Sequence, residues 1–97
     1  MITWTWKRTL RTESSERFLA SSAGMDVAAV DLHYLPSGHV SGTVIILDDS
    51  SITDDDAGLL LESLDDDMLP GVDIQEGTAT FTVVRGRVIG SFESKSQ

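Results

Sequence analysis

The stretch DVAAVDLHYLPSGHVSGTVIIL, residues 26–47, decides the fold. Strand-favouring residues lie on both sides of Pro36-Ser37-Gly38, which suits a type I turn followed by a bulge glycine. The stretch therefore predicts a β-hairpin with strands over residues 26–35 and 39–47. Pairing of Leu35 with His39 would set its register and place one mostly apolar face in the core. That face carries Ala28, Val30, Leu32, Tyr34, Val40, Gly42, Val44 and Ile46.

The other face of the hairpin is mixed and holds the one candidate ligand site. It carries Asp31, His33, Leu35, His39, Ser41, Thr43 and Ile45. Asp31, His33, His39 and Ser41 include two imidazoles and a carboxylate, which zinc accepts as ligands. However, a flat strand face rarely directs three ligands to one point, and His39 lies beside the turn. Structural or solvated histidines are therefore the favoured interpretation, and we expect no cofactor.

A helix is predicted after the hairpin. Thr53 can cap it, the acids Asp54, Asp55 and Asp56 suit its positive end, and Ile52 can pack on the first turn. Helical spacing then places one apolar stripe toward the core, and Pro70-Gly71 ends the element. The stripe contains Ala57, Leu60, Leu61, Leu64 and Met68. Capping explains the acids at 54–56 better than calcium binding does, because the EF-hand pattern is absent.

The two ends of the chain complete the prediction. Apolar and polar residues alternate from Ile2 to Lys7, which indicates a strand. Residues 14–23, which end at Gly24, favour a helix, with a second strand as the alternative. Residues 78–84 and 87–93 predict a hairpin around Arg85-Gly86, or one bent strand that continues through it. Both versions are expected to bury Ala79, Phe81, Val83, Val88, Gly90 and Phe92.

The order of these elements is β-α-β-β-α-β, with the last strand either single or a hairpin. This is the order of the split βαβ or ferredoxin-like plait, an α+β two-layer sandwich with helices on one face of an antiparallel sheet. At 97 residues the chain is long enough for one core, so we expect a single domain over residues 1–97 with a short disordered tail at 94–97. Such a fold does not by itself define a function.

The charge of the chain excludes several classes of function. Sixteen acids against seven Lys and Arg give a net charge of −9, which disfavours direct binding to nucleic acid and to anionic lipid. The six aromatic residues lie outside basic runs and are expected in the core.

No apolar run is long enough to cross a membrane, and there is no signal sequence or cysteine, so a cytoplasmic protein is expected.

Three acids near the C-terminal end of the predicted helix stand out, Asp65, Asp66 and Asp67, and together with Glu62 they form an acidic patch. Acids at a helix C-terminus oppose the helix dipole, so local structure does not explain them. They predict a protein-binding surface for a basic partner, and adaptation to high salt is the competing explanation. Because no catalytic motif is recognisable, we expect a non-enzymatic interaction or regulatory module. The alternative is a small-ligand or metal-binding domain that uses the polar hairpin face.

The state of assembly is open at this stage between monomer and homodimer. A sheet-mediated dimer is suggested by Leu35 and Ile45 on the mixed face of the first hairpin, and by Val84 and Ile89 on the matching face of the C-terminal strands.

Overall fold

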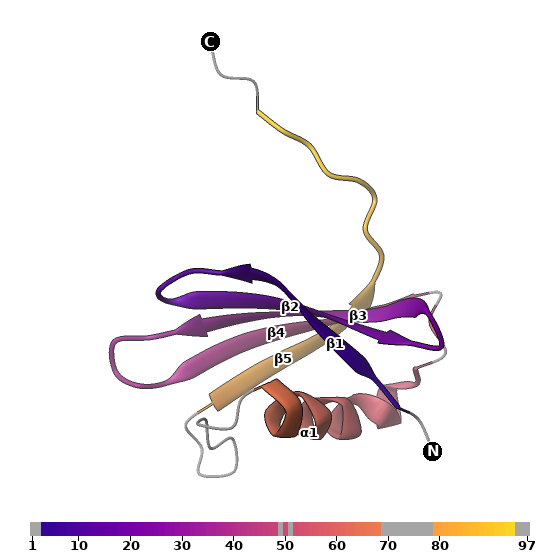
Figure 1. The fold of residues 1–97 in the computed structure, drawn as a ribbon, viewed down its shortest axis with the longest axis horizontal. Helices are drawn as coiled ribbons and strands as arrows, with labels where there is room; N and C mark the ends of the chain where they lie inside the picture. The colour runs from indigo at the N-terminus through magenta and orange to yellow at the C-terminus, as the bar shows by residue number, and fades with distance from the viewer. Residues whose placement is uncertain (1–2, 49, 51, 69–78, 95–97) are drawn as a thin grey trace.

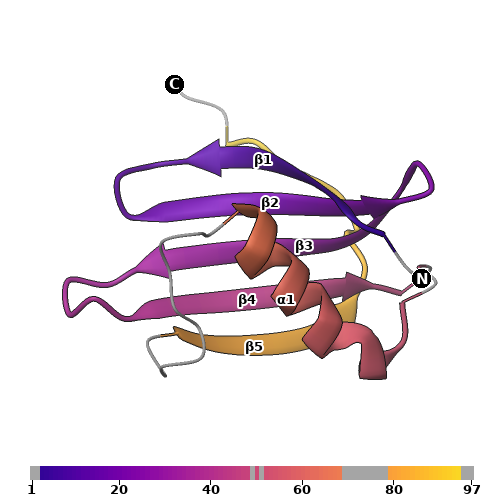
Figure 2. The same ribbon diagram turned by 60° about the horizontal axis from the view of Figure 1, so that its bottom comes forward.

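The first four strands form an antiparallel meander, and the fifth joins it in parallel beside the fourth (Figures 1 and 2). This computed structural model describes residues 3–48, 50, 52–68 and 79–94. Within them, the sheet order is β1-β2-β3-β4-β5, and one α-helix covers one face. The elements are β1 (Thr5–Arg11), β2 (Ser15–Ser22), β3 (Met25–Tyr34), β4 (Val40–Leu47), the 3₁₀ turn η1 (Asp54–Asp56), α1 (Ala57–Met68) and β5 (Ala79–Gly86).

The hairpin of β3 and β4 confirms the prediction in detail. Tyr34 pairs with Val40, and the backbone N–H of Leu35 donates to the carbonyl of His39 at 2.9 Å. Gly38 has a φ of +89°, as expected of the bulge glycine after the turn. The predicted apolar face is buried under α1, apart from Tyr34, which is half-buried.

Most of residues 14–23 form strand β2 (Ser15–Ser22), so the helix favoured for them is wrong and the alternative is correct. Phe18 and Ala20 are fully buried, whereas Arg17 is exposed and Leu19 is half-buried. That alternation has the period of a strand with one face in the core. Gly24 does not end a helix, because it forms a left-handed turn with Ala23 between β2 and β3.

The N-terminal strand is confirmed, although it begins later than expected, at Thr5. Trp4 is buried just before it, and Trp6 packs against the core. The indole N–H of Trp6 donates to the hydroxyl of Ser63 at 2.9 Å, which joins β1 to α1. Ile2 lies outside the described residues.

The predicted C-terminal hairpin is wrong. β5 is one strand that ends at Gly86 and lies parallel to β4, since α1 carries the chain across the sheet. Residues 87–94 then leave the sheet on the side opposite to α1 (Figure 1). Val83, Val88 and Phe92 are 39%, 71% and 90% exposed, and Gly90 is exposed as well, so the expected burial of these four residues is wrong. Ala79 and Phe81 are half-buried. Arg85 is a poor residue for a tight hairpin turn and is instead bonded to Asp54.

The ferredoxin-like order is therefore overturned. Where that plait needs two helices over an antiparallel sheet, the described chain has a five-stranded mixed sheet with one short helix. The error arises from two segments: residues 14–23, which add a strand in place of a helix, and the last strand, which pairs with β4 in parallel.

The helix begins after Thr53 as predicted, although its first turn is the 3₁₀ turn η1 and α1 starts at Ala57. The described residues of its apolar stripe pack on the sheet. The backbone N–H of Thr53 donates to the Asp56 carboxylate at 2.9 Å, as in a capping box. Leu60 and Leu64 are fully buried, and Ile52 is nearly so. The guanidinium of Arg85 donates to Asp54 and to the carbonyl of Ile52, which fastens this end of the helix to β5. Pro70 and Gly71 lie outside the described residues.

Gly42 lies close against the side chains of Phe81 and Leu32 and gives a first prediction. A Cβ at this position would lie 2.5 Å from Cδ1 of Phe81 and 3.0 Å from Cδ2 of Leu32. Gly42→Ala should therefore lower the free energy of unfolding by about 1–3 kcal/mol through overpacking, as measured by chemical denaturation. Phe81→Leu in the same chain should restore part of the loss, and a Gly42→Ala protein as stable as the wild type would contradict this account.

Candidate protein-interaction surface

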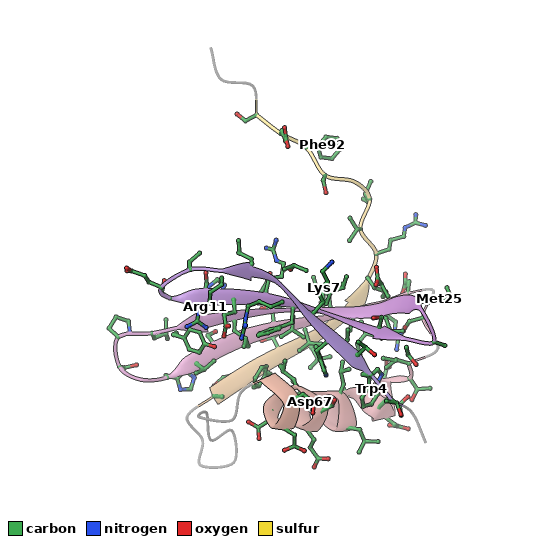
Figure 3. The ribbon with its side chains drawn as sticks, in the orientation of Figure 1. Trp4, Lys7, Arg11, Met25, Asp67 and Phe92 are labelled. Carbon is green, nitrogen blue, oxygen red and sulfur yellow. The ribbon has the colours of Figure 1, made fainter. Side chains whose placement is uncertain are left out.

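The acids predicted to bind a partner lie on α1. Glu62, Asp66 and Asp67 are exposed, and Asp65 is half-buried. Figure 3 shows Asp67 on the helix layer, far from Phe92 on the tail across the sheet. We call the group Glu62, Asp65, Asp66 and Asp67 the acidic helix surface. The structure places Asp66 and Asp67 in the last turn of α1 and Glu62 one turn before Asp66.

Charge is unevenly distributed over the molecule. α1 contains no basic residue in its last turn, so the helix dipole and the acids add up to a negative end. Basic side chains gather instead on β1 and β2, at Lys7, Arg8, Arg11 and Arg17. The hydrogen bond from Trp6 to Ser63 joins α1 to β1, and the buried Leu60 and Leu64 turn the opposite side of the helix outward.

The polar hairpin residues are placed on the sheet face without the helix, and two of them have other partners. Asp31 forms an ion pair with Arg17 at 2.6 Å, and Nε2 of His39 lies 2.8 Å from the hydroxyl of Thr80. His33 and Ser41 are directly opposite each other on β3 and β4. Among the described residues, no group of three or more His, Asp or Glu side chains is close enough to hold a metal ion.

Sequence reasoning missed a buried ionic cluster around Glu16, whose side chain is only 2% exposed. Its carboxylate accepts from Nε of Arg8 at 2.7 Å, pairs with Nη1 of Arg11 at 2.5 Å and accepts from the hydroxyl of Tyr34. The signal was available in the strand alternative, since Glu16, Phe18 and Ala20 then share the core face.

The cluster shifts the ionisation of its members. Burial by itself would raise the pKa of Glu16, but the hydrogen bonds from Tyr34 and Arg11 and the positive charges of Arg11 and Arg8 lower it overall. Burial, together with the bond to the Glu16 carboxylate, raises the pKa of Tyr34 from 10.0 to about 12. Both shifts favour the ionised Glu16 carboxylate and the neutral Tyr34 phenol. The cluster therefore links β1, β2 and β3 through ion pairs and a hydrogen bond.

The Tyr34 shift can be measured directly, because Tyr34 is the single tyrosine of the chain. Phenolate absorbance in the folded protein should rise with a midpoint near pH 12, against about 10 in the unfolded chain. Because the folded pKa is raised, the stability contributed by the neutral phenol is fully present below pH 10 and is lost as pH rises through 12. Glu16→Gln should move the folded midpoint back toward 10, and an unchanged midpoint would contradict the assigned cause.

The described fold and surface define a small sheet domain with one covering helix and a strongly acidic outer layer. Within the described residues, no helix is long and apolar enough to span a membrane. The chain matches no protein-family model, no curated protein and no solved structure. Its function is therefore argued from its own residues.

Proposed function

We infer that this domain is a non-enzymatic protein-interaction module, and that the acidic helix surface binds a basic partner. The observation that carries this proposal is the exposure of Asp66 and Asp67 in the last turn of α1, where acids oppose the helix dipole, with the exposed Glu62 one turn before Asp66. Residues that are unfavourable for the helix itself are often retained for binding.

The surroundings of this surface support the same function. The fully buried Leu60 and Leu64 hold α1 on the sheet, so the acids are presented on a fixed helix and binding need not order a loop. Of the basic side chains of β1 and β2, two lie on the other sheet face, whereas Arg8 and Arg11 share the face of α1 and pair with Glu16. The exposed acids give the acidic helix surface its negative potential. A basic partner would be steered to it by charge, with a strong dependence on salt.

The test is a salt-eluted pull-down from lysate of the source organism with a charge-matched control. The variant Glu62→Gln, Asp66→Asn, Asp67→Asn neutralises the exposed acids and leaves Asp65 intact. The control Glu13→Gln, Asp48→Asn, Asp55→Asn removes the same number of exposed charges elsewhere. A partner retained by the wild type and the control, released by salt and lost by the helix variant, is the expected result.

The opposite outcomes are equally informative. If both variants retain the same partners as the wild type, or if the wild type retains none, the acidic helix surface is not the binding site. In that case adaptation to high salt explains the acids better, and a melting temperature that rises markedly with salt concentration would support it.

A further inference from the structure

The face of the sheet opposite α1 carries an apolar row that crosses four strands. Leu19 pairs with Ala29, Ala29 with Ile45, and Ile45 with Val84. These side chains alternate with the buried ones and therefore point away from α1. Val84 is 44% exposed, and the other three are half-buried although no element covers them in Figures 1 and 2. We call the face that contains this row the open face.

The open face lacks the excess of acids found elsewhere. The row ends at Lys7 on β1, opposite Leu19. In the neighbouring row, Arg17 and Asp31 form an ion pair and are followed by Thr43 and Thr82. A chain with a net charge of −9 repels its own copies, and the open face is a surface where this repulsion is weak.

The C-terminal segment provides apolar side chains on the same side of the molecule. Residues 87–94 leave β5 away from α1, as both views show (Figures 1 and 2). Val88, Ile89 and Phe92 are 71%, 92% and 90% exposed. Exposure of three large apolar side chains in one short segment is typical of a segment that packs against another surface.

The size of the open face suits a second copy of the chain. With about 3.3 Å per residue and about 4.8 Å between strands, it measures roughly 25 by 20 Å. Two such faces would bury roughly 1,000 Å² before the tails are counted, and each Phe adds about 150–250 Å². The total reaches the range of about 1,200–2,000 Å² that is usual for specific interfaces.

We propose that two copies associate through their open faces, with residues 87–93 of each chain packed over the other copy. This dimer goes beyond the proposed function and does not depend on it. α1 remains on the outside of both copies, so a dimer would present two acidic helix surfaces to a partner.

The test measures the dimer dissociation constant by sedimentation equilibrium, in about 0.5 M NaCl to screen the net charge. Val84→Glu places an acid in the row, and Phe92→Glu places one on the tail, where 90% exposure makes a folding defect unexpected. Leu59→Glu is the control, because Leu59 is an apolar residue on α1 that is 55% exposed. Each variant adds the same charge, and circular dichroism checks the fold.

We expect the wild type and Leu59→Glu to dimerise alike, and Val84→Glu and Phe92→Glu each to raise the dissociation constant at least about tenfold. A wild type that stays monomeric at millimolar concentration overturns the dimer and leaves the open face to a different protein. An unchanged dissociation constant in either Val84→Glu or Phe92→Glu, or an equal loss in Leu59→Glu, also overturns it. These outcomes are independent of the pull-down, which probes the opposite side of the sheet.

Discussion

Replacing Phe18 by alanine should lower the free energy of unfolding by about 3–5 kcal/mol. Phe18 is fully buried in β2, opposite Arg8 on β1 and Val30 on β3. The Arg8 guanidinium also lies 5.3 Å from the centre of its ring, so the substitution removes a cation–π contact as well as core volume. Since the total free energy of unfolding of a domain of this size is about 5–15 kcal/mol, the midpoint of chemical denaturation should fall substantially.

The matched control is Leu19→Ala, one residue further along the same strand. Leu19 is half-buried on the open face, so the loss should be about 1 kcal/mol or less. Both proteins should be measured at low concentration, where association through the open face does not contribute. Equal losses at the two positions would contradict a β2 strand with one face under α1.

Glu16→Gln should cost about 2–3 kcal/mol, because it removes a buried charge that is hydrogen-bonded by several groups. The full penalty for an unpaired buried charge does not apply, since Arg8 and Arg11 are 44% and 58% exposed and can turn to water. The double variant with Arg11→Gln should lose less than the sum of the two single losses. Chemical denaturation of the set measures this coupling.

The control for this cycle is Asp31→Asn, which breaks the ion pair with Arg17. Both of those side chains are more than a third exposed, so the expected loss is about 0–1 kcal/mol. A Glu16→Gln protein no less stable than Asp31→Asn would show that burial of the cluster contributes nothing.

Lowering the pH should remove the stability that the Glu16 cluster contributes. Because the folded pKa of Glu16 is lowered from 4.5, its stabilising contribution is fully present above that pH and is lost as pH falls through the folded value. The stability difference between the wild type and Glu16→Gln should therefore shrink in acid. A difference that stays constant down to the lowest accessible pH would contradict the lowered pKa.

The parts of the fold that could be predicted are those in which the deciding residues are neighbours in sequence. The turn at Pro36-Ser37-Gly38 fixes the register of β3 and β4 within a few residues, and Thr53 and Asp56 define the start of α1. The candidate acids could be predicted as a group for the same reason, since residues within two turns of one helix end lie close together.

The parts that failed depend on distant partners. Residues 14–23 contain helix-compatible residues, and it is pairing with β1 and β3 that makes them a strand. β5 lies beside β4 only because α1 returns the chain across the sheet. The ion pairs of Glu16 could not be predicted, because its partners Arg8, Arg11 and Tyr34 come from two other strands.

The sequence by itself determined the β3–β4 hairpin, the capped helix with its apolar stripe, and the net charge with its cluster of acids near the helix end. Each of these follows from short-range turn chemistry, side-chain periodicity or composition. The tertiary structure alone decided that β2 is a strand, that β5 runs parallel to β4, that Glu16 is paired in the core, and that the sheet face opposite α1 stays open beside the exposed Phe92. The physical reason is that burial and strand pairing depend on segments that only the completed fold brings together.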